Sequence, residues 1–475
     1  MKHPPSPPSQ GGFCGNSSKD IHYFHTPMKG IKNLTEGPIL RQLLLLAMPI
    51  MATSFIQMAY SLTDMAWVGR LGSEAIAAVG SVGILTWMTS ALSLLNKVGA
   101  EVSVGQAIGM KDESAARSFS THNLTLSLMI SLAWAFLLFV FASPIIGIYE
   151  LKPNIASEAI SYLRIVTTAF PFVFLSAAFT GIFNAAGRSK IPFTINAIGL
   201  GINMILDPLF IFVFDWKTEG AAWATWIAQA IVFALFVHQL KFKQILWDNF
   251  RFFGRLKQAY TTRIIKIGLP VATLNALFAF VNMFLGRTAS TVGGHLGLMA
   301  MTTGGQIEAI TWNSAQGFST ALSAFVAQNY AARQIHRVMK ALKSTFILTF
   351  VFGMVCTCLF IFCGNDIFAI FVPEKDAYEA GGLFLRIDGY SQLFMMLEIT
   401  LQGVFYGMGR TMPPAIISVT CNYLRIPMAL WFVSLGWGLA GIWWCVCLTS
   451  IVKGIIIFVW FLAIKKKTLD HYNTN

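Results

Sequence analysis

The chain has 475 residues, of which 55% are hydrophobic and 12% are charged, and its formal net charge is +13 at pH 7. Soluble globular proteins carry about 25% charged residues, so this composition excludes an ordinary soluble domain. Apolar stretches of about 20 residues or more recur along the chain, which suits membrane-spanning helices and is too long for the strands of a membrane barrel. The sequence therefore predicts an all-α polytopic membrane protein.

The N-terminal stretch differs from the rest of the chain. Residues 1–27 are rich in Pro, Ser and Gly and contain no apolar segment of the kind that signal peptides carry. We expect a disordered tail over 1–34. Met28 begins the stretch "MKGIKNLTEG", which resembles a natural start.

Twelve apolar spans follow the tail. Their predicted bounds are 39–68, 75–108, 118–141, 157–186, 192–213, 220–240, 260–286, 297–330, 338–363, 380–408, 412–432 and 438–464. Six spans lie in 35–240 and six in 260–465, with a basic linker over 241–259 and a short tail over 466–475.

The gaps between the spans alternate in charge. The even-numbered gaps and the two ends hold most of the lysines and arginines, including Lys111, Arg188, Lys241, Arg337, Arg410 and Lys465. The odd-numbered gaps hold few bases and more acids, such as Glu74, Glu150 and Asp215. Because basic loops stay on the cytoplasmic side, we expect both termini, the linker and the tail in the cytoplasm. The net charge therefore reflects topology and does not indicate nucleic acid binding.

The two sets of spans repeat one another. Three separated stretches match at an offset of 221 or 222 residues: "AMPIMA" around Pro49 with "GLPVAT" around Pro270, "VGQAIGMK" at 104–111 with "VAQNYAAR" at 326–333, and "GIFNAAGRSKIP" at 181–192 with "GVFYGMGRTMPP" at 403–414. A duplicated unit of six helices predicts two pseudo-symmetric lobes, related by an axis along the membrane normal, with a cavity between them. Such repeats are typical of transporters.

Several of these motifs carry a resemblance to a known family. "LTDMAWVGRLG", "VGQAIGMKD", "GIFNAAGRSKIP" and "INMILDPLFIF" occur in order over 35–465 and resemble the multidrug and toxic compound extrusion (MATE) transporters, closer to the prokaryotic DinF-like branch than to the eukaryotic one. The resemblance implies a twelve-helix antiporter of a bacterial cytoplasmic membrane. Such a protein exports organic cations by alternating access, in exchange for Na⁺ or H⁺.

The stretch "GINMILDPLF" at 201–210 places a carboxylate and a proline inside an apolar span. A charged Asp at the centre of a membrane helix costs about 2.5–3.5 kcal/mol on insertion scales, so such residues usually have a function. Asn203 lies on the same helix face as Asp207. Pro208 is expected to kink the helix and to free backbone oxygens, which suit a hard cation. The alternative is a structural Asp207 that bonds to a neighbouring helix.

Two further residues share the outer half of the first lobe with Asp207. Asp64 lies near the outer end of the first span, and Thr225 lies near the outer end of the sixth. Positions matching Asp64, Asn203, Asp207 and Thr225 are similar to the cation-binding site that the family carries in its N-lobe. Two nearby carboxylates in a low dielectric do not both ionise cheaply, so this pair is expected to bind a proton and Na⁺ in alternation. The counterparts of Asn203 and Asp207 in the repeat are Arg425 and Ala429, which restricts the site to the first lobe.

A substrate cavity is the second site that the sequence suggests. Gln57, Tyr60 and Asp64 form a polar stripe on one helix face, which either lines the cavity or bonds to another helix. Glu308 and Asp388 lie near the middle of their spans in the second lobe. These two acids either attract a cationic substrate or pair with Arg287, Arg386 or Arg425.

Other functions find less support in the motifs. The chain lacks HExxH, GxSxG, the GxGD setting of intramembrane aspartyl proteases and a Walker A loop, so we expect a monomeric secondary transporter that uses no ATP. Its expected partners are a small organic cation and the lipid bilayer, with no cofactor beyond the coupling ion. The alternative within the superfamily is a flippase of lipids or lipid-linked sugars, which would need a strongly basic central cavity. An intramembrane aspartyl enzyme built on Asp64 and Asp207 is the alternative from another class.

Overall fold

A computed structural model describes residues 30–149 and 151–465. Most of the predicted N-terminal tail, 1–34, and the whole of the predicted C-terminal tail, 466–475, lie outside the described residues. Within the described ranges the regular secondary structure is helical throughout, with no strand. The prediction of an all-α chain is confirmed.

The first lobe consists of seven α-helices and two π-helical segments. Their bounds are α1 Ile39–Gly69, α2 Ser73–Gly109, α3 Glu113–Val140, α4 Ala142–Gly147, α5 Pro153–Ala185, α6 Lys190–Pro208, η1 Leu209–Val213, α7 Lys217–Val237 and η2 His238–Phe242. The short α4 follows α3 directly, while η1 and η2 prolong α6 and α7. The lobe therefore has six spans.

The second lobe consists of α8 Gln258–Ala331, α9 Ile335–Phe371, α10 Lys375–Gly407, α11 Met412–Ser434 and α12 Gly438–Ile464. Helix α8 holds two spans, because Gly294 breaks it with φ 60° and ψ −144°. A positive φ of this kind is readily adopted only by glycine. The loop expected over 287–296 is thus replaced by a reversal at a single residue.

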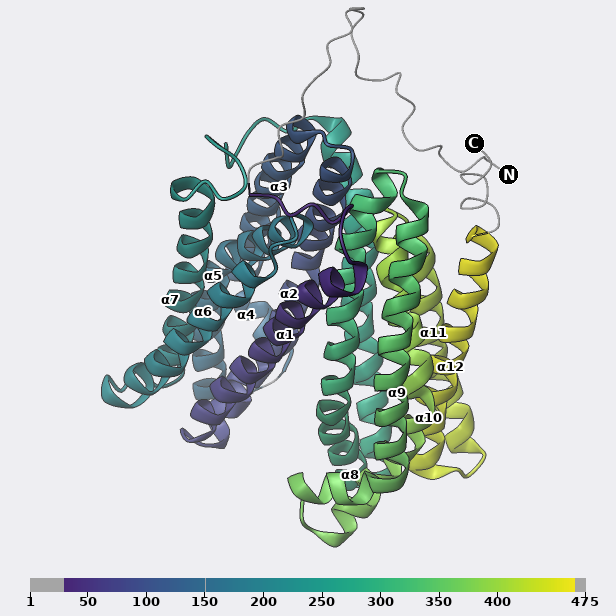
Figure 1. Cartoon of the computed structure of the whole chain (residues 1–475). Helices are drawn as coiled ribbons and strands as arrows, with labels where there is room; N and C mark the ends of the chain where they lie inside the picture. The colour runs from purple at the N-terminus through teal and green to yellow at the C-terminus, as the bar shows by residue number, and fades with distance from the viewer. Residues whose placement is uncertain (1–29, 150, 466–475) are drawn as a thin grey trace, which may run out of the picture.

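Ten helices of the described chain are long and apolar enough to cross a membrane, and α8 is one of these ten. Helix α10 is not among these ten, and it carries the charged residues Arg386, Asp388 and Glu398 within its length. Counting α8 twice and adding α10 gives the twelve predicted spans. Figure 1 shows α1–α7 and α8–α12 as two neighbouring bundles, as the repeat predicts.

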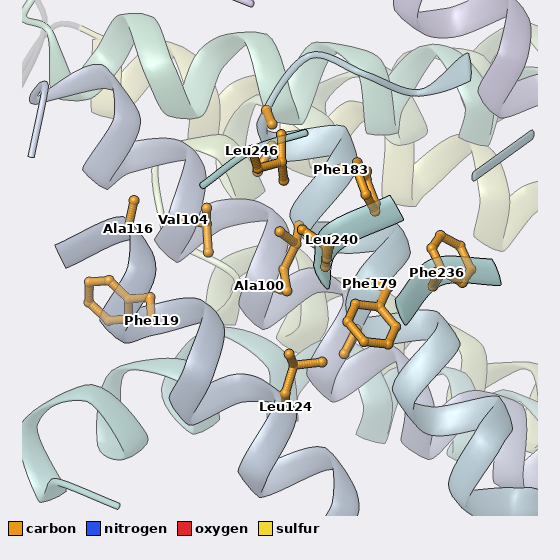
Figure 2. Close-up of a cluster of buried hydrophobic side chains, with 14 of the residues drawn as sticks. Ala100, Val104, Ala116, Phe119, Leu124, Phe179, Phe183, Phe236, Leu240 and Leu246 are labelled. Atoms are coloured by element: carbon orange, nitrogen blue, oxygen red, sulfur yellow. The ribbon is translucent and has the colours of Figure 1, made fainter. Parts of the chain in front are cut away.

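The linker between the lobes packs against the first lobe. Trp247 is only 1% exposed, and Leu246 belongs to the core that α2, α3, α5 and α7 share. Figure 2 shows Leu246 beside this core, which includes Phe179 and Phe183. Thr121 of α3 donates a hydrogen bond to the carbonyl of Arg251 at 2.6 Å. The linker is therefore anchored well before α8 begins.

The two lobes use equivalent residues to pack their helices closely. A Cβ on Gly181 of α5 would lie 2.2 Å from the carbonyl oxygen of Lys97 on α2. A Cβ on Gly403 of α10 would lie 2.5 Å from the carbonyl oxygen of Ser319 on α8. Both pairs are related by an offset of 222 residues, so the sequence repeat is also a repeat of helix packing.

The close approach of α5 to α2 gives a direct test of this packing. Gly181→Ala should destabilise the protein by about 1–3 kcal/mol, because the added methyl group meets a backbone oxygen that a helix holds in place. Gly201→Ala on α6 is the matched control, since its Cβ would enter open space. Melting temperatures of the purified variants in detergent would show the difference. Equal melting of the two variants would contradict the packing described here.

Candidate ion-binding site

The centre of the candidate site is the pair Asn203 and Asp207 on α6. Both residues are 0% exposed. The side-chain amide of Asn203 donates from Nδ2 to Oδ1 of Asp207 at 3.1 Å, one helical turn away. The sequence placed these two residues on one face, and the hydrogen bond orients the carboxylate.

The helix changes form directly after Asp207. Pro208 ends the α-helical part of α6, and the five residues Leu209–Val213 form a π-helix. The wider π turn often occurs at functional sites. Helix α11 of the second lobe also contains a proline, Pro427, but it stays α-helical over Met412–Ser434. Of these two equivalent helices, only the one that carries Asp207 therefore continues into a π-helical turn.

Helices α1 and α7 bring further oxygen atoms to this place. Tyr60 interacts electrostatically with Asp64 and Asp207, and Thr225 lies within its reach. Asp64 in turn interacts with Asp207. The structure thus brings together all four residues predicted for ion coupling, and it adds Tyr60 to them.

Five oxygen atoms of this cluster are buried without a hydrogen-bond partner in the described part of the chain. They are Tyr60 Oη, Asp64 Oδ1, Asn203 Oδ1, Asp207 Oδ2 and Thr225 Oγ1. A buried polar atom left unpaired costs about 1–3 kcal/mol. Five such atoms from three helices form a set that a cation or a proton would satisfy.

The donor set suits a small hard ion. It combines two carboxylates with amide and hydroxyl oxygens, which are ligands of alkali and alkaline-earth cations. The described residues contain no group of three or more His, Cys, Asp or Glu side chains that could hold a metal ion. Two carboxylates, of which one can be protonated, match a monovalent cation better than a transition metal.

Two members of the surroundings were not identified from the sequence. Tyr162 of α5 is buried and interacts electrostatically with Asp64, Tyr60 and Asp207. Gln229 lies one turn after Thr225 on α7 and within reach of Tyr60. The spacing of Thr225 and Gln229 was a usable signal, whereas nothing in the sequence places Tyr162 near this cluster.

Gln57 does not join this cluster. Its side chain is exposed, whereas the hydroxyl of Tyr60 is buried one turn further along α1. The polar stripe predicted for this helix therefore divides into an exposed residue and two residues of the buried cluster.

The acids Glu308 and Asp388 lie together in the second lobe, close to a buried arginine. Asp388 accepts hydrogen bonds from Ser391 Oγ at 3.1 Å and from Gln392 Nε2 at 2.5 Å. Glu308 is half-buried and interacts with Asp388 and Arg425. Arg425 donates to the hydroxyls of Thr449 and Ser450, both at 2.9 Å. Of the three arginines expected as partners, Arg425 is the one that lies close.

A second buried charge pair in this lobe was not predicted. Lys453 Nζ of α12 lies 3.1 Å from Oε2 of Glu398 on α10. Ser418 and Gln402 donate to the same carboxylate at 2.7 and 2.9 Å. The partner of Glu398 is thus a lysine from another helix.

Comparisons with known proteins agree with this architecture. A family profile described as MatE matches twice, over residues 49–209 and 270–431. The probable multidrug resistance protein NorM of Thermotoga maritima is 24% identical over 437 residues, which cover 90% of this chain and 92% of that protein. The multidrug export protein MepA of Staphylococcus aureus is 21% identical over 445 residues, which cover 92% of this chain and 96% of that protein.

Solved structures show the same fold. A MATE crystal structure in a bent conformation has a TM-score of 0.88 at 21% identity and covers 93% of this chain and 98% of its own. The two profile matches fall one in each lobe and together span more than half of the chain. The chain therefore belongs to the MATE family of membrane transporters.

Proposed function

We propose that the chain is an ion-coupled antiporter that exports small organic cations across a bacterial cytoplasmic membrane. The observation that carries the proposal is the set of five unpaired, buried oxygen atoms around Asp207. A helical membrane protein normally pairs every buried polar group within itself. Other buried polar atoms of the described chain are unpaired as well, but here five oxygen atoms from three helices gather around two carboxylates, which is consistent with a site that an ion enters and leaves.

The coupling ion is H⁺ or Na⁺. A proton on one carboxylate would supply a hydrogen-bond donor to the unpaired oxygens, and Na⁺ would supply a cation at the same place. Because both ions use Asp64 and Asp207, binding of one excludes the other. A site that alternates between an occupied and an open state can drive the exchange that antiport needs.

The ion site is confined to the first lobe. At the equivalent places the second lobe has Arg425 for Asn203 and Ala429 for Asp207. Arg425 is buried and already carries a positive charge, so a free cation has no place beside it. We infer that Glu308 and Asp388 act with this arginine and that the half-buried Glu308, together with exposed Gln57, contacts the substrate.

The arrangement of the lobes supports alternating access. Most side-chain hydrogen bonds that cross between the lobes in the described chain lie in the half of the molecule that carries the basic loops. The bond farthest from the basic loops joins Trp87 to Asn275, near the middle of the helices. The positive-inside pattern places this half in the cytoplasm, together with both termini. The state described here is then closed toward the cytoplasm.

The names of the relatives point to drugs as substrates. Both NorM of T. maritima and MepA of S. aureus are named for multidrug resistance or export. A flippase of lipid-linked sugars would need free basic groups in a central cavity, whereas the buried Lys453 pairs with Glu398 and the buried Arg425 bonds to two hydroxyls. We therefore favour organic cations as substrates of a monomeric exporter.

Removing the charge at the centre of the site tests the proposal. Asp207→Asn and Asp64→Asn should each lower gradient-driven efflux of a fluorescent organic cation by at least about tenfold, because each removes a charged ligand of a buried ion. Proteoliposomes with an imposed Na⁺ or H⁺ gradient would give the measurement and would identify the ion. Asp215→Asn is the control, since this exposed acid lies in the turn before α7. Normal efflux by both site variants would refute the assignment.

Asn203 should act by orienting Asp207. Asn203→Ala removes the hydrogen bond to Asp207 and should weaken the apparent affinity for the coupling ion by about 10–100-fold, as loss of an orienting partner does at metal sites. Asn196→Ala is the matched control, because the Asn196 amide bonds to the carbonyl of Pro192 in its own helix. The ion concentration at half-maximal efflux is the readout. An unchanged value for Asn203→Ala would exclude the orienting role.

A further inference from the structure

Two glutamines from equivalent places in the repeat bind across the interface between the lobes. Gln106 of α2 donates from Nε2 to the carbonyl of Gly407 at 3.0 Å, and Gly407 is the last residue of α10. Gln328 of α8 donates from Nε2 to the carbonyl of Ala185 at 2.7 Å, and Ala185 is the last residue of α5. Both glutamines and both acceptors are buried.

The acceptors are related in the same way as the donors. An offset of 222 residues converts Gln106 into Gln328 and Ala185 into Gly407. Carbonyls in the last turn of a helix have no partner within that helix. Each glutamine therefore caps the C-terminal end of a helix in the opposite lobe, so each lobe both donates and accepts one bond of this kind.

The carboxamide oxygens of the two glutamines are also bound from across the interface. Oε1 of Gln106 accepts from Nη2 of Arg263, near the start of α8, at 2.5 Å. Oε1 of Gln328 accepts from the backbone N–H of Leu34, ahead of α1, at 3.0 Å. Each glutamine thus makes two hydrogen bonds to the other lobe, one as donor and one as acceptor.

The pseudo-twofold axis passes beside these residues. A Cβ on Gly105 of α2 would lie 2.9 Å from the Cβ of Ala327 on α8, and Ala327 is the counterpart of Gly105 in the repeat. A residue that meets its own counterpart lies next to the symmetry axis, as in an isologous interface. The two glutamines follow this contact directly, so they lie at the centre of the closed face.

We propose that Gln106 and Gln328 form a two-fold latch that holds the lobes together at the end carrying the basic loops. This inference rests on the alternating-access part of the proposed function. If the lobes rock about the axis, all four bonds of the latch break in one step. Three of the four bonds join neutral amides and carbonyls, and the fourth frees the half-buried guanidinium of Arg263 near the start of α8. Water at the opened basic end can pair all of these groups.

The latch can be tested by distance measurements between spin labels in lipid nanodiscs. Labels at Lys190→Cys and Met412→Cys, two exposed positions related by the repeat, report on the basic end. Labels at Val213→Cys and Leu435→Cys, likewise exposed and related, report on the opposite end. Replacing Cys14, exposed Cys358 and half-buried Cys363 by Ser limits labelling to the chosen sites.

Gln106→Ala and Gln328→Ala should each raise the ratio of open to closed molecules at the basic end by about tenfold, since two hydrogen bonds are lost. The distance at the opposite end should shorten in the same molecules. Should the alanine variants not fold, Gln106→Asn and Gln328→Asn, which are too short to reach the carbonyls, should give the same shift. Gln402→Ala is the matched control, because this buried glutamine bonds within the second lobe.

Unchanged distances in the latch variants, or an equal shift in Gln402→Ala, would overturn the proposal. Lengthening at both ends together would also overturn it, since that indicates general loosening. Failure of the proposed function has a different signature. Normal efflux by both Asp207→Asn and Asp64→Asn would refute ion coupling and would leave the distance result of the latch variants intact.

Discussion

The contact between α2 and α8 is the constraint on which the arrangement of the two lobes depends. Small residues, Gly105 and Ala327, let the two helices approach closely at the pseudo-twofold axis. Without a hydrophobic force between helices in lipid, such close packing and the hydrogen bonds it permits hold membrane helices together. Each glutamine can reach a helix end in the opposite lobe only because the helices cross at this distance. The interface between the lobes is thus built from residues that the repeat relates to one another.

The two lobes share their packing but differ in how they treat charge. In the first lobe the carboxylates of Asp64 and Asp207 lie close together, and each has an oxygen without a hydrogen-bond partner in the described part of the chain. The second lobe places the guanidinium of Arg425 where the first has Asn203, so its acids have a permanent counter-charge. The coupling ion that we propose for the first lobe would thus correspond to the fixed charge of Arg425 in the second. The asymmetry lies in a few side chains and in the π-helical turn that follows Asp207 in the first lobe only.

Much of the fold followed from the sequence, because span length and helix periodicity are local properties and the repeat is visible when one half of the chain is aligned with the other. The twelve spans, the two lobes and the shared face of Asn203 and Asp207 are of this kind. Interactions between separate helices, such as the ion pair of Glu398 with Lys453, depend on helix tilt and rotation. Those angles are set by packing between neighbours, so no single span encodes them. The reversal at Gly294 was not predicted, because the pair Gly293–Gly294 is equally typical of a longer loop.

The anchored linker limits how far the lobes can separate. The backbone N–H of Gly254 still donates to Thr125 Oγ1 of α3, at 3.1 Å, while α8 begins at Gln258. Only residues 255–257 remain as a tether between these points, and three extended residues span about 10 Å. The start of α8 therefore stays near α3 throughout any motion that preserves this bond. When the basic end opens, the start of α8 is therefore the pivot, and the larger displacement falls to the helices that lie farther from this tether.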